Sequence, residues 1–232
     1  MKQAVELVVF DIAGTTVEDN GEIAIAFQEA LQAFGYTVPV ATINPLMGYK
    51  KTEAIKRILK EHEQKKEKIS TEYIQKIHQL FQEKMMEFYS TTDQLNPLPF
   101  AEEVFDCLKV RNILVGLDTG FSKEITDIII HRLGWLKNKK IDYVISSNEV
   151  IAGRPFPYMI EELMLKAKIN DAKKVIKVGD TEVDVNEGRN AGCLYSIAVT
   201  TGAFTKEELA LHEPSFIIDD LRELIPIINN IQ

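Results

Sequence analysis

The chain has 232 residues, 45% hydrophobic and 27% charged, which is typical of a soluble globular protein with one large core or a core plus a smaller domain. Its formal net charge of -8 excludes a strongly basic surface, so we expect no nucleic-acid or anionic-membrane partner. No apolar run approaches the roughly 20 residues that a membrane-spanning helix needs.

The first residues and the cysteines bear on the compartment. Residues 1–6 lead directly into an apolar run and lack the pattern of a signal peptide. The two cysteines, Cys107 and Cys193, show neither zinc-site spacing nor a paired arrangement, which favours free thiols. We therefore expect a cytoplasmic protein.

A buried strand and a carboxylate open the chain. Leu7 to Phe10 form a short apolar run of the kind that makes a strand buried on both faces. Asp11 follows at once, and then Gly14 and two threonines, a sequence that turns easily and exposes backbone N–H groups. Since ligands of open α/β sheets bind outside the carboxyl ends of the strands, Asp11 lies where chemistry is expected. Taken alone, the stretch is equally compatible with a strand and a simple turn.

The next part of the chain is helical. Apolar residues at helical spacing predict one helix over residues 22–34, a second that begins near an N-cap at Thr52, and a third from Ser70 to about Tyr89. No run between residues 17 and 94 has the pattern of a strand. We therefore predict a helical cap over residues 17–95, inserted directly after the first strand.

From Pro97 onward apolar runs alternate with helical segments. This alternation predicts parallel strands joined by crossover helices, with strand candidates at residues 113–117, 143–145, 175–178, 196–199 and, more weakly, 216–218. The predicted fold is α/β: a Rossmann-like parallel-sheet core built from residues 1–16 and 96–232, with an inserted all-helical cap domain.

Two later stretches offer groups that bind phosphate. Thr119 and Gly120 follow the second strand and precede a helix, where a hydroxyl, backbone N–H groups and a helix N-terminus can all donate to a phosphate. Arg154 follows a glycine and precedes Pro-x-Pro, and its guanidinium can grip phosphoryl oxygens with two parallel N–H groups. A turn with a capped helix, or a surface cation, would explain each stretch separately.

Two carboxylates follow the fourth strand. Asp180 and Asp184 are four residues apart at the start of a predicted helix, so they can face one pocket. Hard oxygen ligands of this kind suit Mg²⁺, which takes one or two protein carboxylates and keeps several waters. Favourable interaction of these carboxylates with the helix dipole is the simpler alternative.

In this order, the motifs resemble those of the haloacid dehalogenase superfamily. The stretch from Asp11 to Thr15 matches its first motif, Asp-x-Asp-Gly-Thr, except that Ala13 replaces the second Asp. Asp-x-Ala-Gly-Thr, together with arginine in a Gly-Arg-Pro-x-Pro setting at Arg154, is similar to the phosphonatase branch of the superfamily. The stretch from Val175 to Gly192 resembles that branch well beyond the motif itself.

The resemblance implies a mechanism and a set of roles. Asp11 would attack phosphorus to form an aspartyl-phosphate that water then hydrolyses. Mg²⁺ would be held by Asp11, Asp180 and the Ala13 carbonyl. Thr119, Gly120 and Arg154 would bind the phosphoryl group, and Asp184 would orient metal-bound waters or Thr15.

Ala13 cannot donate a proton, whereas the Asp that it replaces protonates the leaving group in ordinary members. Phosphonatases instead use a cap lysine that forms a Schiff base with an aldehyde substrate. The sequence Met47-Gly48-Tyr49-Lys50-Lys51 resembles their Met-Gly-x-x-Lys, which makes Lys51 the candidate Schiff-base residue. One departure is that Ala54 stands where phosphonatases have a histidine.

Three functions remain open at this point. The first is a Mg²⁺-dependent phosphonatase-like hydrolase that cleaves a small phosphonate such as phosphonoacetaldehyde. The second is a phosphate-monoester phosphatase that lacks the usual Asp acid, and the third is a non-catalytic protein that binds phosphorylated ligands. Each takes a small phosphorylated or phosphonate molecule, and a homodimer formed through the cap is a further expectation.

Overall fold

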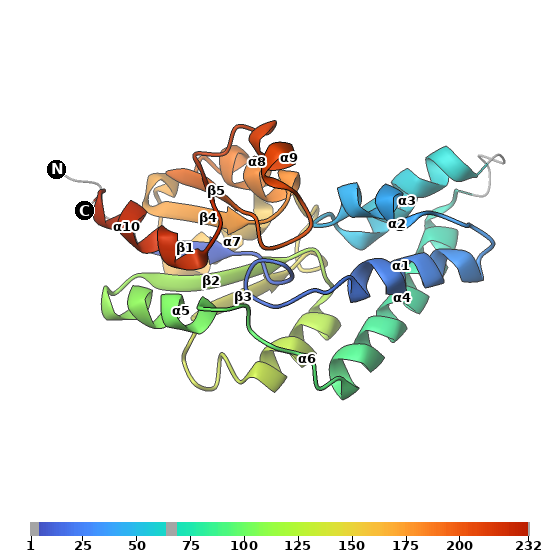
Figure 1. Cartoon of the computed structure of the whole chain (residues 1–232), viewed down its shortest axis with the longest axis horizontal. Coiled ribbons are helices and arrows are strands. Elements are labelled where there is room, and N and C mark those ends of the chain that lie inside the picture. Colours follow the sequence, from blue (N-terminus) through green and yellow to red (C-terminus); the bar gives the residue numbers. More distant parts are fainter. Residues whose placement is uncertain (1–4, 64–68, 232) are drawn as a thin grey trace.

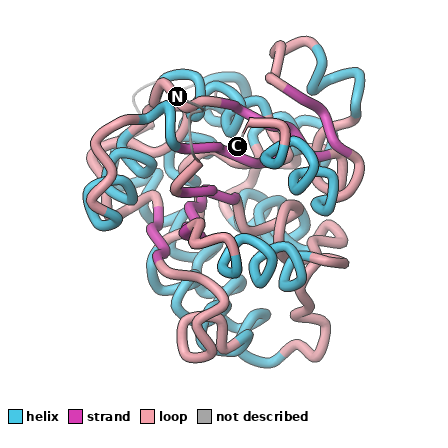
Figure 2. Tube along the Cα trace, turned by 90° about the vertical axis from the view of Figure 1, so that its left-hand side faces the viewer, coloured by secondary structure: helices cyan, strands magenta, loops and turns pink. Residues whose placement is uncertain are grey.

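The computed structural model describes residues 5–63 and 69–231. Six parallel strands form one sheet in the order β3-β2-β1-β4-β5-β6. Helices lie on both sides of it (Figures 1 and 2). The strands are β1 (Leu7–Phe10), β2 (Leu114–Thr119), β3 (Tyr143–Ser146), β4 (Val175–Gly179), β5 (Tyr195–Val199) and β6 (Phe216–Ile218).

Side chains of β1 alternate between the two faces of the sheet. Val8 and Phe10 join the larger apolar cluster, in which Phe10 packs edge-on against Phe105 of α5 (Ala101–Val110) at 5.4 Å. Leu7 and Val9 join a second cluster with α7 (Tyr158–Ala167). Because β1 is central and covered on both faces, all of its residues are apolar.

The other core helices follow β2, β4, β5 and β6; all but the last of them, which ends the chain, connect two strands. They are α6 (Lys123–Leu133), α8 (Glu182–Asn190), α9 (Lys206–Ala210) and α10 (Leu224–Asn229). Together with the strands they make the Rossmann-like α/β core that the alternating pattern predicts. In the described part of the chain, no helix is both long enough and apolar enough to cross a bilayer.

The helices between β1 and α5 form a group beside the sheet, on the right in Figure 1. They are α1 (Glu22–Ala33), α2 (Val40–Ile43), α3 (Lys51–His62) and α4 (Thr71–Thr91). Phe27 of α1 packs against Phe81 of α4 at 5.4 Å, and Ser70 caps α4 by accepting a hydrogen bond from the Tyr73 N–H. The predicted inserted all-helical cap is thus present in the described residues.

Two linkers join this cap to the core, and they run side by side. Val17 forms an isolated bridge with Pro97, the Glu18 N–H donates to the Asn96 carbonyl (3.1 Å), and the Leu98 N–H donates to the Thr16 carbonyl (2.8 Å). We propose these linkers as the boundary between a core of residues 1–16 and 96–232 and a cap of residues 17–95.

Three details differ from the sequence-based expectations. Strand β2 continues to Thr119, because Asp118 and Thr119 still pair with β3. Helix α3 begins at Lys51 rather than after an N-cap at Thr52, so Lys51 occupies the first helical position. The short helix α2 was not predicted, because four residues are too few to show helical periodicity.

Candidate active site

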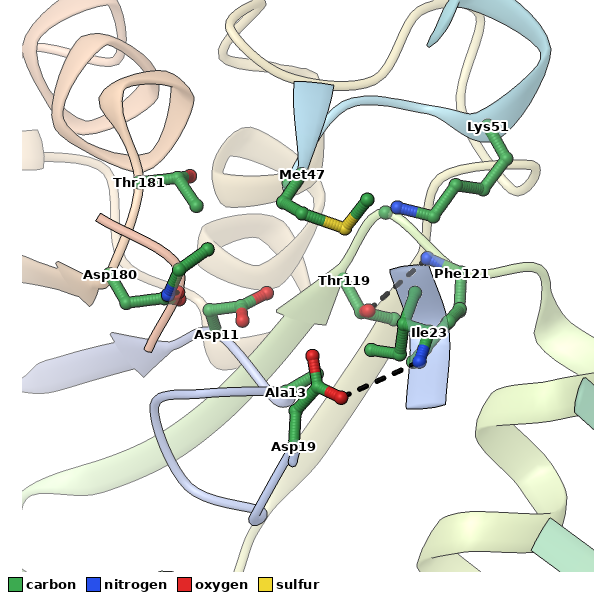
Figure 3. Close-up of a pocket in the computed structure, with 13 residues that line it drawn as sticks. Asp11, Ala13, Asp19, Ile23, Met47, Lys51, Thr119, Phe121, Asp180 and Thr181 are labelled. Carbon is green, nitrogen blue, oxygen red and sulfur yellow. Dashed lines mark hydrogen bonds between the residues drawn. The ribbon is translucent and has the colours of Figure 1, made fainter. Parts of the chain in front are cut away.

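A pocket of about 380 Å³ lies between the carboxyl ends of the strands and the cap (Figure 3). Four titratable side chains line it, and we call them the pocket group: Asp11, Asp19, Lys51 and Asp180. The other lining residues used below are Ala13, Met47, Gly48, Thr119, Gly120, Phe121, Thr181 and Ala203. The pocket therefore receives residues that follow β1, β2 and β4, one residue from the loop after β5, and residues from the cap.

Asp11 is fixed by the end of the sheet. It directly follows β1, and its N–H donates to the Val178 carbonyl of β4 (3.0 Å). Burial raises the pKa of Asp11 to about 6, against the lowering effect of the nearby Arg154 guanidinium. Asp11 is therefore mainly ionised at neutral pH, as a carboxylate nucleophile must be. Ala13 lines the pocket two residues further on and brings no titratable group.

Asp180 lies opposite Asp11, just after β4. One of its oxygens accepts a hydrogen bond from the Thr15 hydroxyl (3.0 Å), and the other accepts one from the Ala203 N–H (2.7 Å). Thr15 thus pairs with Asp180 and not with Asp184, the partner considered from the sequence. Burial, followed by the negative charges of Asp11 and Asp184, raises the pKa of Asp180 to about 8.

Lys51 enters the pocket from the cap and is only 4% exposed. Burial lowers the pKa of Lys51 to about 8, although the carboxylates of Asp11 and Asp19 act in the opposite direction. Its ammonium nitrogen lies 5.8 Å from the centre of the Phe121 ring. Because Lys51 is also the first residue of α3, the positive end of that helix further disfavours its charged form.

The cap loop that carries Lys51 is closed tightly over the core. A Cβ at Gly48 would lie 2.5 Å from the Thr181 hydroxyl oxygen, and one at Gly120 would lie 2.7 Å from the Gly48 and Tyr49 carbonyl oxygens. The Tyr49 hydroxyl donates to Glu182 at the start of α8 (2.7 Å). Two glycines therefore permit the close approach that encloses the pocket.

Arg154 lies beneath the pocket and does not line it. Its side chain is fully buried, and Nη1 lies 2.6 Å from Asp11 Oδ1 and 3.0 Å from Asp184 Oδ1. Nε donates to Glu187 (3.1 Å), and Nη2 donates to both the carbonyl (2.8 Å) and the carboxylate of Asp118. In this structure Arg154 therefore contacts the nucleophile directly and is surrounded by carboxylates.

Lys177, a fully buried lysine in β4, completes this arrangement. Its ammonium group pairs with Asp118, Asp184 (3.1 Å) and Glu187 (3.4 Å). We call the set Asp118, Arg154, Lys177, Asp184 and Glu187 the inner layer. Asp118 and Glu187 are also hydrogen-bonded to each other, and burial raises the pKa of Glu187 well above its usual range. The raised pKa of Glu187 therefore favours its protonated form beside Asp118.

Two sets of carboxylates could hold a metal ion. Oxygens of Asp11, Asp118 and Asp184 lie within 4.8 Å of one another, but Arg154 and Lys177 already neutralise the last two. Asp11 and Asp180 face the open pocket instead; the charge of Asp11 raises the pKa of Asp180, and that of Asp180 raises the pKa of Lys51. Crowded hard oxygens that face an open pocket suit a divalent cation such as Mg²⁺.

The structure brings most of the sequence-predicted site residues together. Asp11, Ala13, Lys51, Thr119, Gly120 and Asp180 line one pocket, Thr15 supports Asp180, and Arg154 and Asp184 lie in the layer beneath. The sequence-based interpretation missed Asp19, Asp118, Lys177 and Glu187. Lys177 and Asp118 carried a usable signal, because a charged residue inside an apolar strand needs a buried partner.

Comparison with known proteins places the chain among hydrolases. The family model described as "Haloacid dehalogenase-like hydrolase" matches residues 8–199. A phosphonoacetaldehyde hydrolase from Bacillus mycoides is 30% identical over 97% of this chain and 87% of its own length. One from Bacteroides fragilis is 31% identical over 90% of this chain and 80% of its own length.

Solved structures support the fold. A phosphonoacetaldehyde hydrolase-like protein from Oleispira antarctica superposes with a TM-score of 0.83 at 24% identity, covering 99% of this chain and 93% of its own. A putative phosphoglycolate phosphatase from Lactobacillus delbrueckii superposes with a TM-score of 0.78 at 18% identity, covering 98% of this chain and 99% of its own. The chain is a hydrolytic enzyme and belongs to the haloacid dehalogenase-like hydrolase family.

Proposed function

We propose that this enzyme is a phosphonatase-like hydrolase that cleaves the C–P bond of a small phosphonate such as phosphonoacetaldehyde. The observation that carries the proposal is the placement of Lys51: a buried lysine with a pKa of about 8 lines the same pocket as Asp11. The pocket is small and the cap loop closes over it, which suits a small substrate.

Lys51 supplies an electron sink in this proposal. Its neutral amine adds to the aldehyde carbon, water leaves, and a protonated imine forms between the lysine and the substrate. The C–P bond then breaks while its electron pair moves toward the imine nitrogen. A lysine of ordinary pKa would be almost wholly protonated at neutral pH, so the lowered pKa of Lys51 fits an amine nucleophile.

Asp11 is the proposed acceptor of the phosphoryl group. Its carboxylate attacks phosphorus as the C–P bond breaks, and water later hydrolyses the aspartyl-phosphate. Thr119 and Gly120 line the same pocket at the end of β2, where a hydroxyl and backbone N–H groups can bind phosphoryl oxygens. For Arg154 to grip the phosphoryl group as proposed, its Nη1 must give up one of its two carboxylate partners.

Mg²⁺ is the proposed cofactor, held by Asp11, Asp180 and the Ala13 carbonyl. The carboxylates that face the open pocket are suitable ligands for this ion. When bound, the ion would offset the repulsion between the Asp11 carboxylate and an anionic phosphoryl group. Thr15 would hold Asp180 in place through its hydroxyl. Asp184 would act from the inner layer through Arg154.

A phosphate-monoester phosphatase is the second candidate. The observation that favours it is Ala54, which stands in place of the histidine expected beside a Schiff-base lysine. In that case Lys51 would only bind the substrate as a cation. Membership of a hydrolase family weighs against the third possibility, a non-catalytic binding protein.

Borohydride trapping separates the two candidates. With phosphonoacetaldehyde, borohydride should reduce the imine, inactivate the enzyme and leave a stable adduct on Lys51 that peptide mass spectrometry locates. Lys51→Arg keeps the positive charge but cannot form an imine, so it should lose C–P cleavage, whereas Lys50→Arg should retain it. An unmodified Lys51, or an active Lys51→Arg, would reject the imine mechanism and favour the phosphate-monoester phosphatase.

A further inference from the structure

The leaving group in this pocket needs a proton, and Ala13 has none to give. Cleavage of a phosphate ester leaves an alkoxide, and cleavage of the phosphonate leaves an enamine whose carbon must be protonated. Of the four titratable side chains that line the pocket, Asp11 must be ionised to attack. Asp180 faces it as a proposed metal ligand, and Lys51 is needed as an amine or a cation. Asp19 is the remaining one.

Asp19 reaches the pocket from the first linker between core and cap. Its Oδ1 accepts hydrogen bonds from the N–H groups of Gly21 (3.1 Å) and Ile23 (3.5 Å), which anchors the side chain at the start of α1. Gly21 adopts a φ of 99°, a conformation that favours glycine and turns the chain there. In Figure 3 the second oxygen of Asp19 points away from Ile23, toward the side of the pocket that holds Asp11.

From this placement we infer that Asp19 is the proton donor to the leaving group, a role that residue 13 cannot fill. In ester cleavage, the Asp11–phosphorus bond forms as the P–O bond breaks, and the electron pair goes to the leaving oxygen. That oxygen takes the Asp19 proton, so Asp19 ends as a carboxylate that can accept a proton from the attacking water.

The same residue serves C–P cleavage, where the inference rests on the proposed imine. The C–P electron pair moves into the imine and produces an enamine on Lys51. The enamine carbon that left phosphorus takes the proton of Asp19, which restores the protonated imine, and water then releases the aldehyde. In both cases one proton moves from Asp19 to the atom that parted from phosphorus.

The surroundings of Asp19 favour its protonated form. Burial raises the pKa of Asp19, and the negative charge of Glu22 adds to the effect, while the backbone N–H groups of Gly21 and Ile23 act against it. The simpler role is that Asp19 only caps the start of α1. The two roles are separable, because Asp19→Asn retains the accepting oxygen of the cap but removes the acid.

The test compares substrates whose leaving groups differ in their need for a proton. p-Nitrophenyl phosphate releases a stable phenolate and needs little help, whereas phosphonoacetaldehyde and small alkyl phosphates need an acid. Asp19→Asn should lower kcat for the second kind by about 10²–10⁴ and change p-nitrophenyl phosphate turnover little. Asp19→Glu should keep more of the acid-dependent activity than Asp19→Asn.

Glu18→Gln is the matched control, since Glu18 lies beside Asp19 and does not line the pocket. Equal losses on all substrates in Asp19→Asn would show a capping role only and overturn the inference. Wild-type turnover of p-nitrophenyl phosphate alone would also overturn it, because no acid would then be working in the pocket. Acid-dependent turnover of alkyl phosphates without phosphonoacetaldehyde cleavage would reject the proposed function and leave the role of Asp19 standing.

Discussion

The pocket group and the inner layer are two sets of buried charges at the same edge of one sheet, yet they are balanced differently. In the inner layer, Arg154 and Lys177 each contact several carboxylates, and Glu187 is hydrogen-bonded to Asp118. In the pocket group, Lys51 faces three carboxyl groups, of which Asp11 also pairs with Arg154 of the inner layer (2.6 Å).

This difference separates stability from function. Buried charges that are fully paired hold neighbouring elements in place, and removing one partner leaves the others uncompensated. Buried charges that lack partners cost stability and are typical of sites that bind or transform a ligand. The paired charges of the inner layer thus stabilise the strand ends beneath the pocket group.

Replacing the nucleophile gives the largest expected effect. Asp11→Asn should abolish turnover, by on the order of 10⁴ or more, because an amide cannot form the aspartyl-phosphate. The inner layer should stay intact, so far-UV circular dichroism should not change. Rapid quenching followed by mass spectrometry should find phosphate on Asp11 in the wild type only. Unchanged turnover in Asp11→Asn would contradict the aspartyl-phosphate mechanism and the catalytic role of the pocket group.

The parallel-sheet core was predictable because its signals are local. Short apolar runs marked the buried strands, and the carboxyl ends of parallel strands meet at one edge, so Asp11, Thr119 and Asp180 could be placed together. The periodicity of the cap helices was equally clear. The pairing that lengthens β2 to Thr119 was not predictable, because it depends on the neighbouring strand β3.

The division between pocket and inner layer was not predictable. Asp180 and Asp184 have the same chemistry, and only the rotation of α8 turns Asp184 inward, where it caps that helix through Thr181 and meets Arg154. Arg154 looks like a phosphate ligand in the sequence, since its four carboxylate neighbours come from distant segments. Asp19 resembles an ordinary helix cap, and only the path of the linker brings it to the pocket.

Lys177→Met tests the structural side of the comparison. The substitution leaves Asp118 and its neighbours with Arg154 alone, so the free energy of unfolding should fall by about 3–5 kcal/mol, measured by urea unfolding. Lys174→Met is the control, because Lys174 lies in the same segment but forms an exposed pair with Glu6 (2.7 Å). That control should leave the urea midpoint close to that of the wild type, because exposed ion pairs contribute little to stability. Similar losses in the two variants would show that the inner layer does not stabilise the fold.

Lys51→Met tests the pocket group, where removing a charge should raise the free energy of unfolding. The pKa of Lys51 is about 8 in the folded protein against 10.5 for a free lysine, so the unfolded chain binds more protons between these values. Below pH 8 the buried amine therefore costs stability on the order of 3 kcal/mol, and the cost disappears as pH rises toward 10.5. Lys51→Met should unfold at higher urea than the wild type at pH 7, with the advantage shrinking at pH 10, although it is inactive. A variant less stable than the wild type at pH 7 would place Lys51 with the inner layer instead.

Gly48→Ala should give the smallest effect, because it changes neither set of charges and alters only the closure between them. Gly48 has a φ of 80°, and an added Cβ would lie 2.5 Å from the Thr181 hydroxyl oxygen and 2.6 Å from a Val183 methyl carbon. The cap loop must then lift slightly from the core, which carries Lys51 away from Asp11. KM should rise about tenfold, corresponding to about 1.4 kcal/mol, and the urea midpoint should fall modestly because alanine at a positive φ is strained. Gly35→Ala is the control, since Gly35 also has a positive φ (89°) but nothing lies within 4 Å of its added Cβ. An equal rise in KM for both variants would mean that backbone strain, and not the fit of cap to core, is responsible.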